Sequence, residues 1–553
     1  MKKIIKYIVL FFGLATTFSA CNVLDLDPTD RFSESVVWNS EESVDTYVIG
    51  FYGFMKEATE INDLLHYNDA FSDIIKSSSW NQYNHFYNVS LLQESTFNDI
   101  DAGAFECWKD CYAEIRQDNE FLRDAAKYAE KFGDEFMNAR IAEIKVVRAY
   151  AYFKLMRVYG CKTIEKGGVV PRLVLEGPEA NDKPRTTWAE SWQIIIDDLT
   201  FAAEHLPVSW GSQRRFTKAA AYAFLTRAGL YAERWDVVIA AAEKCKELGC
   251  RLSPDYEKVF TNIDNPENIF AVNYVAGKMT HRADVFFRPI GDSPHHSNAG
   301  LYGGFGPTSE LVDSYEMADG SEFSWKEHGE NPYVGREPRF YATILYNGCR
   351  WEGRNLETYV GGADGIRPFT VSGAAGSTTT GYYLKKYITE GDDVWEKNGS
   401  YHFFPFIRYA EVLLNYAEAL AEQDWSGNSA KALSALNEVR QRVGLPDRKA
   451  SNLKEFREML RHERMVELAG EGFRYWDLRR WGIAQEVIHG QVAHGCKITK
   501  TSAEGVEPAT FKYEQISVDA DRTRTFYDRF YAFSIPIVER SNNKLLGPNN
   551  PGW

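Results

Sequence analysis

The pattern of hydrophobic and polar positions divides the chain into two helical parts separated by a long irregular one. In the first part the apolar residues follow a helical period, which predicts helices over residues 35–56, 105–132, 134–159, 187–206, 217–233 and 235–248. The same period returns more than 150 residues later and predicts helices over 408–421 and 429–443. Because a helix pair cannot bury its apolar face alone, we expect these helices to stack into one scaffold. The residues between the two parts are then a long insertion.

Short motifs mark several helix ends. Thr187 and Glu190 form a capping box, and Gly444 followed by Pro446 is a typical helix stop. The triplet Tyr-Ala-Glu recurs without a fixed spacing, at residues 112–114, 128–130, 231–233 and 416–418. Paired helices with Tyr and Ala at packing positions resemble degenerate tetratricopeptide units.

The insertion is richer in glycine and aromatic residues than the two helical parts. Of the 41 glycines in the chain, 17 fall between Gly300 and Gly399, together with several tryptophans and many tyrosines. Short alternating runs such as residues 341–346 indicate small strands. We therefore expect loops and small strands in this stretch, and no helices.

Residues 461–482 are a dense mixture of aromatic, arginine and carboxylate side chains. We expect two helical pieces hinged at Gly470 and Gly472, with same-face pairs at a spacing of three: Glu471 with Arg474, and Asp477 with Arg480. Such a mixture is costly to bury unless each charge has a partner, so we interpret the segment as a structural connection between the helices and whatever packs over them.

A catalytic or metal-binding role for the same segment is disfavoured. His462-Glu463 begins like a zinc-protease motif, but Val466 occupies the position of the second histidine. Glutamates recur every four residues, at 463, 467 and 471. A row of this kind is usually a solvated or arginine-paired face, so no acid–base site is predicted here.

The first 20 residues have the features of an export signal. Three lysines precede an apolar run that is too short to span a bilayer, and Phe18-Ser19-Ala20 precedes Cys21. This arrangement resembles a lipobox, in which the signal is removed before the cysteine and that cysteine is lipidated. We expect a lipid anchor at Cys21, with an ordinary secretory signal as the alternative.

Charge and cysteine content narrow the function classes. Removal of the signal lysines takes the formal net charge from −15 to −18, which argues against nucleic-acid binding. Seven cysteines remain after Cys21, so at least one is free in a monomer, and we expect most to be small buried residues. No metal site or cofactor is predicted; whether a calcium ion braces the insertion stays open.

Residues 461–482 closely resemble the C-terminal signature of the RagB/SusD-like nutrient-uptake lipoproteins. Further segments match the same family: residues 22–30, 148–160, 407–419, 436–446 and 533–553. The resemblance implies a mainly α, SusD-like fold with tetratricopeptide-type helix pairs as the scaffold and an irregular loop and short-strand insertion. It also implies a lipid-anchored protein of the outer membrane that faces the cell exterior and lies against a SusC-type TonB-dependent transporter.

The expected organisation has five parts. They are a lipoprotein signal peptide (1–20), a lipidated extended leader (21–34), a helical scaffold with a loop at 62–104 (35–275), the Gly- and aromatic-rich insertion (276–405), and returning helix pairs with the C-terminal signature (406–553).

Aromatic residues in the predicted loops are candidates for a sugar site. The apolar C–H faces of a pyranose stack on aromatic rings, while its hydroxyl groups need amide or carboxylate partners. For a single loop aromatic, burial in a small local core is the more common role. With that alternative open, the predicted ligand-binding residues are Trp80, Tyr83, Asn81, Asn84, Tyr302, Trp325 and Trp351.

Together these features predict non-catalytic capture of an oligosaccharide or polysaccharide and its delivery to the transporter. Two alternatives stay open. One is a glycoside hydrolase, for which no pair of carboxylates stands out among the 78 acidic residues. The other is a structural or gating subunit of a transporter that handles peptide or glycopeptide.

Overall fold

Long helices form the scaffold and follow one another along the chain. The computed structural model describes residues 34–57, 68–77, 97–211, 214–295, 303–366, 378–391, 399–519 and 523–553. The long helices of the first part are α6 (Trp108–Phe132), α7 (Asp134–Tyr159), α8 (Trp188–His205), α9 (Lys218–Tyr231) and α10 (Trp235–Glu247). The predicted helices between residues 105 and 248 are thus confirmed, with ends shifted by at most three residues.

The first predicted helix, over residues 35–56, is divided. Its residues form α2 (Glu34–Val37), α3 (Glu41–Phe51) and α4 (Gly53–Glu57). Ser40 causes the first interruption, because its extended backbone and its hydroxyl, which accepts from the amide of Ser43, make it an N-cap rather than a helix interior.

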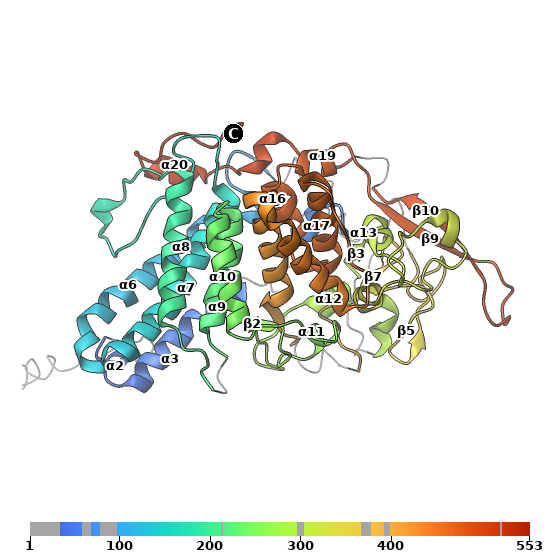
Figure 1. Ribbon diagram of the computed structural model, residues 1–553, viewed down its shortest axis with the longest axis horizontal. Coiled ribbons are helices and arrows are strands. Elements are labelled where there is room, and N and C mark those ends of the chain that lie inside the picture. Colours follow the sequence, from blue (N-terminus) through green and yellow to red (C-terminus); the bar gives the residue numbers. More distant parts are fainter. Residues whose placement is uncertain are drawn as a thin grey trace, which may run out of the picture.

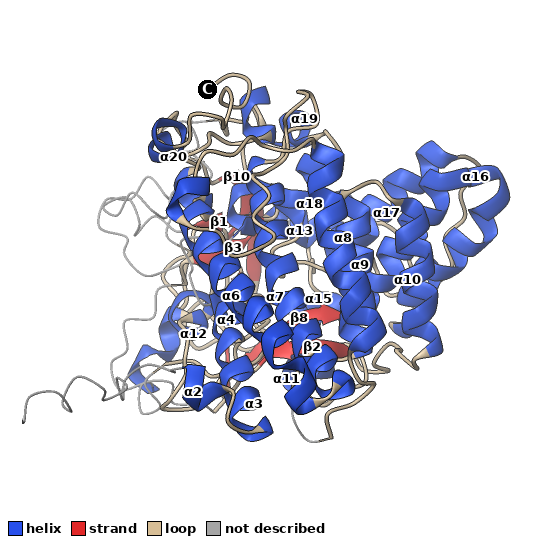
Figure 2. Ribbon diagram, turned by 90° about the vertical axis from the view of Figure 1, so that its left-hand side faces the viewer, coloured by secondary structure: helices blue, strands red, loops and turns tan. Residues whose placement is uncertain are grey.

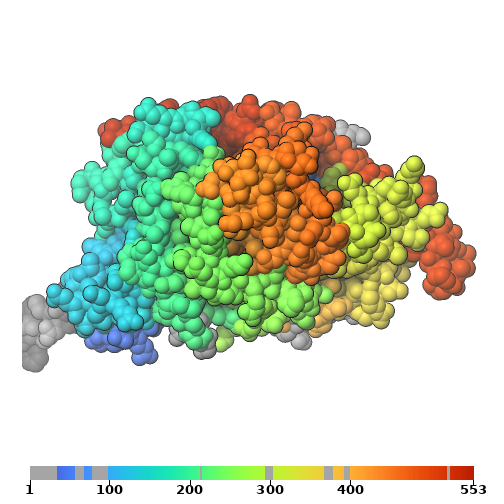
Figure 3. Space-filling model, in the orientation of Figure 1, coloured from blue at the N-terminus to red at the C-terminus, as the bar shows by residue number. Residues whose placement is uncertain are grey.

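Consecutive helices of the scaffold pack against each other from α6 to α10, and α10 and α9 also contact α16 (Tyr409–Arg442). Figure 1 shows α6 to α10 side by side, with α16 and α17 (Leu453–Glu467) next to them. In Figure 3, α16 covers the middle of this face, between the first helices and the insertion. The scaffold is therefore resumed after the insertion, as the sequence predicted.

Local sequence explains the turns between these helices. Gly133, with φ +80°, connects α6 to α7 in a conformation that favours glycine. The predicted capping box is present, with the Thr187 hydroxyl accepting from the Glu190 amide and the Glu190 carboxylate accepting from the Thr187 amide. The two helices predicted after residue 408 are joined as α16, and the break between them lies at Asp424, whose backbone is not helical.

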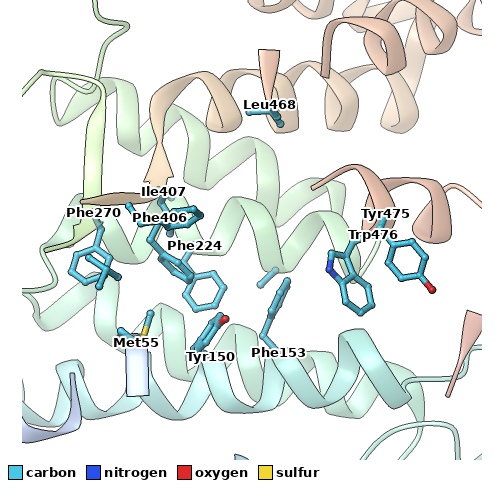
Figure 4. Close-up of a cluster of buried hydrophobic side chains, with 14 of the residues drawn as sticks. Met55, Tyr150, Phe153, Phe224, Phe270, Phe406, Ile407, Leu468, Tyr475 and Trp476 are labelled. Atoms are coloured by element: carbon cyan, nitrogen blue, oxygen red, sulfur yellow. The ribbon is translucent and has the colours of Figure 1, made fainter. Parts of the chain in front are cut away.

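Aromatic side chains fill the space between the scaffold and the strands next to it. In Figure 4, Tyr150 and Phe153 of α7 lie against Phe224 of α9, and Phe406 lies on the other side. The Tyr150 and Phe406 rings meet edge to face with centroids 5.2 Å apart. Burial of several large rings on both sides makes this contact a main part of the core.

Among the residues that the structure describes, the strands form five separate antiparallel pairs and no large sheet. They are β1 (Ile75–Ser77) with β3 (Phe305–Pro307), β2 (Asn268–Val272) with β8 (Phe404–Arg408), β4 (Ile344–Leu345) with β7 (Tyr383–Leu384), β5 (Arg350–Trp351) with β6 (Arg354–Asn355), and β9 (His494–Lys500) with β10 (Phe511–Ser517). Figure 2 shows these short strands set among the helices.

The insertion contains small strands, as predicted, but the expectation that it lacks helices is wrong. Short helices occur at α13 (Ser309–Ser314), α14 (Trp325–His328) and α15 (Pro338–Thr343). The strand predicted over residues 341–346 is reduced to Ile344–Leu345, because Pro338 starts a helix that runs through Thr343.

The remaining elements are short. They are α11 (Lys258–Thr261), α12 (Ala283–Phe287), α18 (Arg474–Arg480), α19 (Ala484–Ile488), α20 (Ile537–Asn542) and single 3₁₀ turns. Within the described ranges, none of the helices has the length and apolar character needed to cross a bilayer.

A buried network of charges, here called the Glu467 network, connects the insertion to the scaffold. Glu467, at the end of α17, accepts from three guanidinium groups: Arg408 at 2.7 Å, Arg442 at 2.6 Å and Arg339 at 3.0 Å. All four side chains are at most 2% exposed. Burial alone raises the pKa of Glu467, but the three arginines hold it well below its usual value.

The network branches through the other two glutamates of the row. Glu471 accepts from Arg408 and from Lys386 at 2.9 Å. Glu463 accepts from Arg339 and from Arg440, and Arg440 continues to Glu316 at 2.8 Å. The glutamate row is therefore arginine-paired, which is one of the two arrangements that the sequence left open.

The two predicted same-face pairs have different outcomes. Asp477 and Arg480 form an ion pair at 2.8 Å, which confirms that pair. The pairing of Glu471 with Arg474 is not formed, because Gly470 and Gly472 turn the chain between α17 and α18. Arg474 instead binds Asp73 at 2.8 Å.

We predict that Glu467→Gln lowers the free energy of unfolding by about 3 kcal/mol or more, because it leaves three buried guanidinium groups without a full counter-charge. Urea denaturation at pH 7 measures the loss. The control is Glu458→Gln on the same helix, whose carboxylate is 63% exposed and lies 4.0 Å from Lys454; it should cost less than about 0.5 kcal/mol. Equal, small losses in both variants would contradict the structural role of the network.

A second prediction concerns Glu316. Burial by itself raises its pKa, but Arg440 and Arg448 outweigh burial and lower the pKa to about 2 from an ordinary value of 4.5. A carboxyl group with a lowered folded-state pKa stabilises the protein above its unfolded pKa, and this contribution is lost as pH falls from about 4.5 toward 2. Glu316→Gln should therefore cost more stability at pH 7 than at pH 3, measured by urea denaturation. An equal cost at both pH values would argue against these ion pairs.

Candidate functional site

Trp325 is the predicted aromatic residue that the structure places at the surface in a fixed orientation. It opens α14 and is half-buried. Its indole N–H donates to Asp313 Oδ2 at 2.7 Å, and Phe323 meets its ring edge to face with centroids 5.5 Å apart. These two contacts restrain the indole, so it costs little entropy to present the ring to a ligand.

The ring borders an open groove with a volume of about 800 Å³, here called the Trp325 groove. One side is α14 with the loop that follows it, and the other is β10. The groove is lined by the polar or aromatic side chains of His328, Asn331, Tyr513 and Gln515, and by the charged side chains of Lys326, Glu327 and Glu330. A ring flanked by an amide, an imidazole and a phenol has the composition that a sugar requires.

Asp313 holds the Trp325 indole in place at the groove through its hydrogen bond with the indole N–H. Burial raises its pKa to about 6, while the hydrogen bond from Trp325 acts in the opposite direction. The group is therefore mostly a carboxylate at neutral pH, which strengthens its bond with the indole. Gln515 of β10 lies 3.4 Å from the same oxygen, so Asp313 connects the two sides of the groove.

Trp351 is contradicted as a ligand-binding residue. Its side chain is 1% exposed, and its indole N–H donates to the buried Asp292 at 2.8 Å. The Arg288 guanidinium lies 5.5 Å from the ring centroid. Trp351 therefore belongs to the core of the insertion and offers no ring face to a ligand, which is the alternative role considered for any loop aromatic.

The other predicted positions lie outside the described residues. These are the lipidation site Cys21 and the ligand-binding candidates Trp80, Asn81, Tyr83, Asn84 and Tyr302.

Tyr513 and Gln515 were missed by the sequence reasoning. They follow Trp325 by almost 200 residues and lie two apart on β10, so the alternation of a strand places them on one face. The alternation in residues 511–517 could have identified the strand, but nothing in the sequence links that strand to Trp325.

The described residues contain no group of three or more His, Cys, Asp and Glu side chains arranged to hold a metal ion. The seven cysteines after Cys21 are all free thiols, and five of them are buried. This confirms the expectation that most act as small buried residues.

Comparison with protein families identifies the class of the protein. The model of the family described as "SusD family" matches residues 266–553, and one described as "Starch-binding associating with outer membrane" matches residues 23–230. The chain belongs to the SusD family. SusD family proteins are outer-membrane-associated, non-catalytic proteins that bind glycans, so the chain is not assigned an enzymatic activity.

Individual relatives cover the whole chain. SusD-like protein P2 of Formosa agariphila is 24% identical over 99% of this chain and 100% of its own length. The crystal structure of a SusD-like protein from Bacteroides fragilis is 29% identical, with a TM-score of 0.78 over 96% of this chain and 100% of that one. A SusD-like carbohydrate-binding protein of the same species is 25% identical, with a TM-score of 0.72 over 93% and 100%. The predicted family and fold class are thereby confirmed.

Proposed function

We propose that the protein captures an oligosaccharide or polysaccharide at the cell surface and delivers it to a SusC-type TonB-dependent transporter in the outer membrane. The observation that carries the proposal for this chain is the half-buried Trp325, restrained by Asp313 beside an open groove. Capture requires stacking and hydrogen bonds and no covalent step.

The groove supports the choice of a sugar as ligand. The restrained Trp325 ring offers a surface for the C–H face of a pyranose. Asn331 and Gln515 offer amide groups to its hydroxyls, and Tyr513 adds a second ring from the opposite side. An open groove also admits an internal unit of a long chain, whereas a closed pocket admits only an end.

A laminarin-binding SusD-like protein shares the fold, with a TM-score of 0.66 at 22% identity. Laminari-oligosaccharides are therefore included in the test alongside other neutral glucans and galactans.

The proposal extends to residues outside the described ranges. The loop positions Trp80, Asn81, Tyr83, Asn84 and Tyr302 are proposed as further ligand contacts. Lipidation at Cys21 is proposed to hold the protein on the outer membrane facing the exterior, close to the transporter.

Calorimetric titration of the chain from residue 22 onward with the oligosaccharide panel tests the proposal. We expect Trp325→Ala to weaken binding of the preferred sugar about ten-fold, since about 1.4 kcal/mol of stacking is lost. Trp235→Ala on α10, which removes a half-buried tryptophan outside the groove, is the matched control and should bind normally.

Each result has a defined meaning. Unchanged affinity in Trp325→Ala, with binding by the native chain, would exclude the Trp325 groove as the site and keep the capture function. Absence of binding to every sugar would contradict saccharide capture by the isolated chain. Release of new reducing ends from the bound sugar would contradict a non-catalytic role.

A further inference from the structure

A second cavity, here called the α6 cavity, lies in the helical part of the molecule. It has a volume of about 590 Å³, is open to solvent, and is lined by the first three turns of α6, residues 170–181 and residues 539–543 at α20. Figure 1 shows α20 and β10 toward opposite ends of the long axis, so this cavity is well separated from the Trp325 groove.

Hydrogen-bond donors in this cavity lack partners. The Trp108 indole N–H has no acceptor among the described residues and touches open space at the cavity, whereas the Trp108 backbone amide donates to Glu106 at 2.8 Å. Lys109 forms no ion pair in the described part of the chain, and Arg116 makes only a 3.4 Å contact with the carbonyl of Glu176. Lys109 and Arg116 are exposed, so both cations can bind a ligand or water at the cavity without losing an ion pair.

The other charged groups leave a surplus of positive charge. Arg172 and Lys183 both bind Glu176, so that carboxylate is neutralised within the wall of the cavity. Glu539 is the one lining carboxylate of the described residues without an ion pair. The two cations Lys109 and Arg116 therefore outnumber the one unpaired carboxylate, Glu539, although the chain has a net charge of −15. The cavity also lies at the N-terminal end of α6, where the helix dipole is positive.

Tyr112 adds a restrained ring to the same cavity. Its hydroxyl donates to the carbonyl of Val170 and accepts from the amide of Val170, both at 2.9 Å. The ring is half-buried and packs on Trp108 with centroids 5.0 Å apart. It can contact the C–H face of a sugar whose charged group lies near Arg116.

We propose that the α6 cavity is a second ligand site that takes the anionic unit of an acidic saccharide. Arg116, Lys109 and the Trp108 indole N–H bind its carboxylate or sulfate oxygens, and Glu539 accepts from a neighbouring hydroxyl. The saccharide part of this statement rests on the proposed function; the anionic part rests on the donors of the cavity. The exposed aliphatic side chain of Val174, which lines the cavity, makes a protein segment the rival occupant.

Titration calorimetry at low ionic strength with paired probes tests the site. Oligogalacturonate and its methyl ester differ in the carboxylate charge, and a sulfated carrageenan oligosaccharide and its desulfated form differ in the sulfate. At least one anionic probe should bind ten-fold or more tightly than its neutral counterpart, and added salt should weaken it. The carboxylate and the sulfate arms distinguish the two sources of the anion. Absence of any preference for an anionic probe would overturn the proposal and leave a protein as the occupant to consider.

Substitutions of the lining residues test whether the anionic probe binds in the α6 cavity. Arg116→Gln and Lys109→Gln should each weaken the anionic probe five-fold or more, while Glu539→Gln should tighten it by removing repulsion. The control is Arg123→Gln, two turns further along α6 and paired with Asp124, which should change nothing. Unchanged binding in both Arg116→Gln and Lys109→Gln would overturn the proposal.

The Trp325→Ala variant separates this proposal from the proposed function. The α6 cavity should retain anionic binding when Trp325 is absent. Loss of anionic binding in Trp325→Ala but not in Arg116→Gln would place the acidic sugar in the Trp325 groove. That result would contradict a second site in the α6 cavity and support the Trp325 groove as the sugar site.

Discussion

The pairing of buried charges around Glu467 is the constraint on which the arrangement of this protein depends. A carboxylate without exposure to water is tolerated because three guanidinium groups surround it, and each of these groups has further carboxylate partners. Arg408 comes from the junction of β8 and α16, and Arg339 comes from the insertion. Separation of the insertion from the scaffold would leave charges unpaired on both sides. The two parts are therefore held in one relative position.

That fixed position brings the binding surface together. Glu316 is joined to Arg440 of α16, and Asp313 lies one turn earlier on α13, where it holds the Trp325 indole. Tyr513 and Gln515 reach the same groove from the C-terminal strand pair. A rigid helical scaffold with binding residues on irregular segments is a common division of roles in proteins. Here the Glu467 network links the helical scaffold to the insertion that carries Trp325.

Much of this structure could be predicted from the sequence, and the limits have physical reasons. The helices could be predicted because their apolar period is local. The Glu463–Glu467–Glu471 row was expected to be either solvated or arginine-paired, and the structure has the second arrangement. The partners were not predicted, since Arg408 and Arg339 lie 59 and 128 residues from Glu467. Trp351 could not be told from Trp325 by its neighbours; its burial depends on Asp292, which is 59 residues away. Likewise, the contribution of β10 to the groove follows from long-range packing, which no local pattern records.

Amide hydrogen exchange with and without a saturating neutral oligosaccharide tests the central claim, that ligand is held between α14 and β10. The account predicts slower exchange on binding in residues 323–334 and 511–517, and no change in α6 or in residues 170–181. Protection confined to other segments, with exchange in residues 323–334 and 511–517 unaltered by a bound sugar, would contradict it.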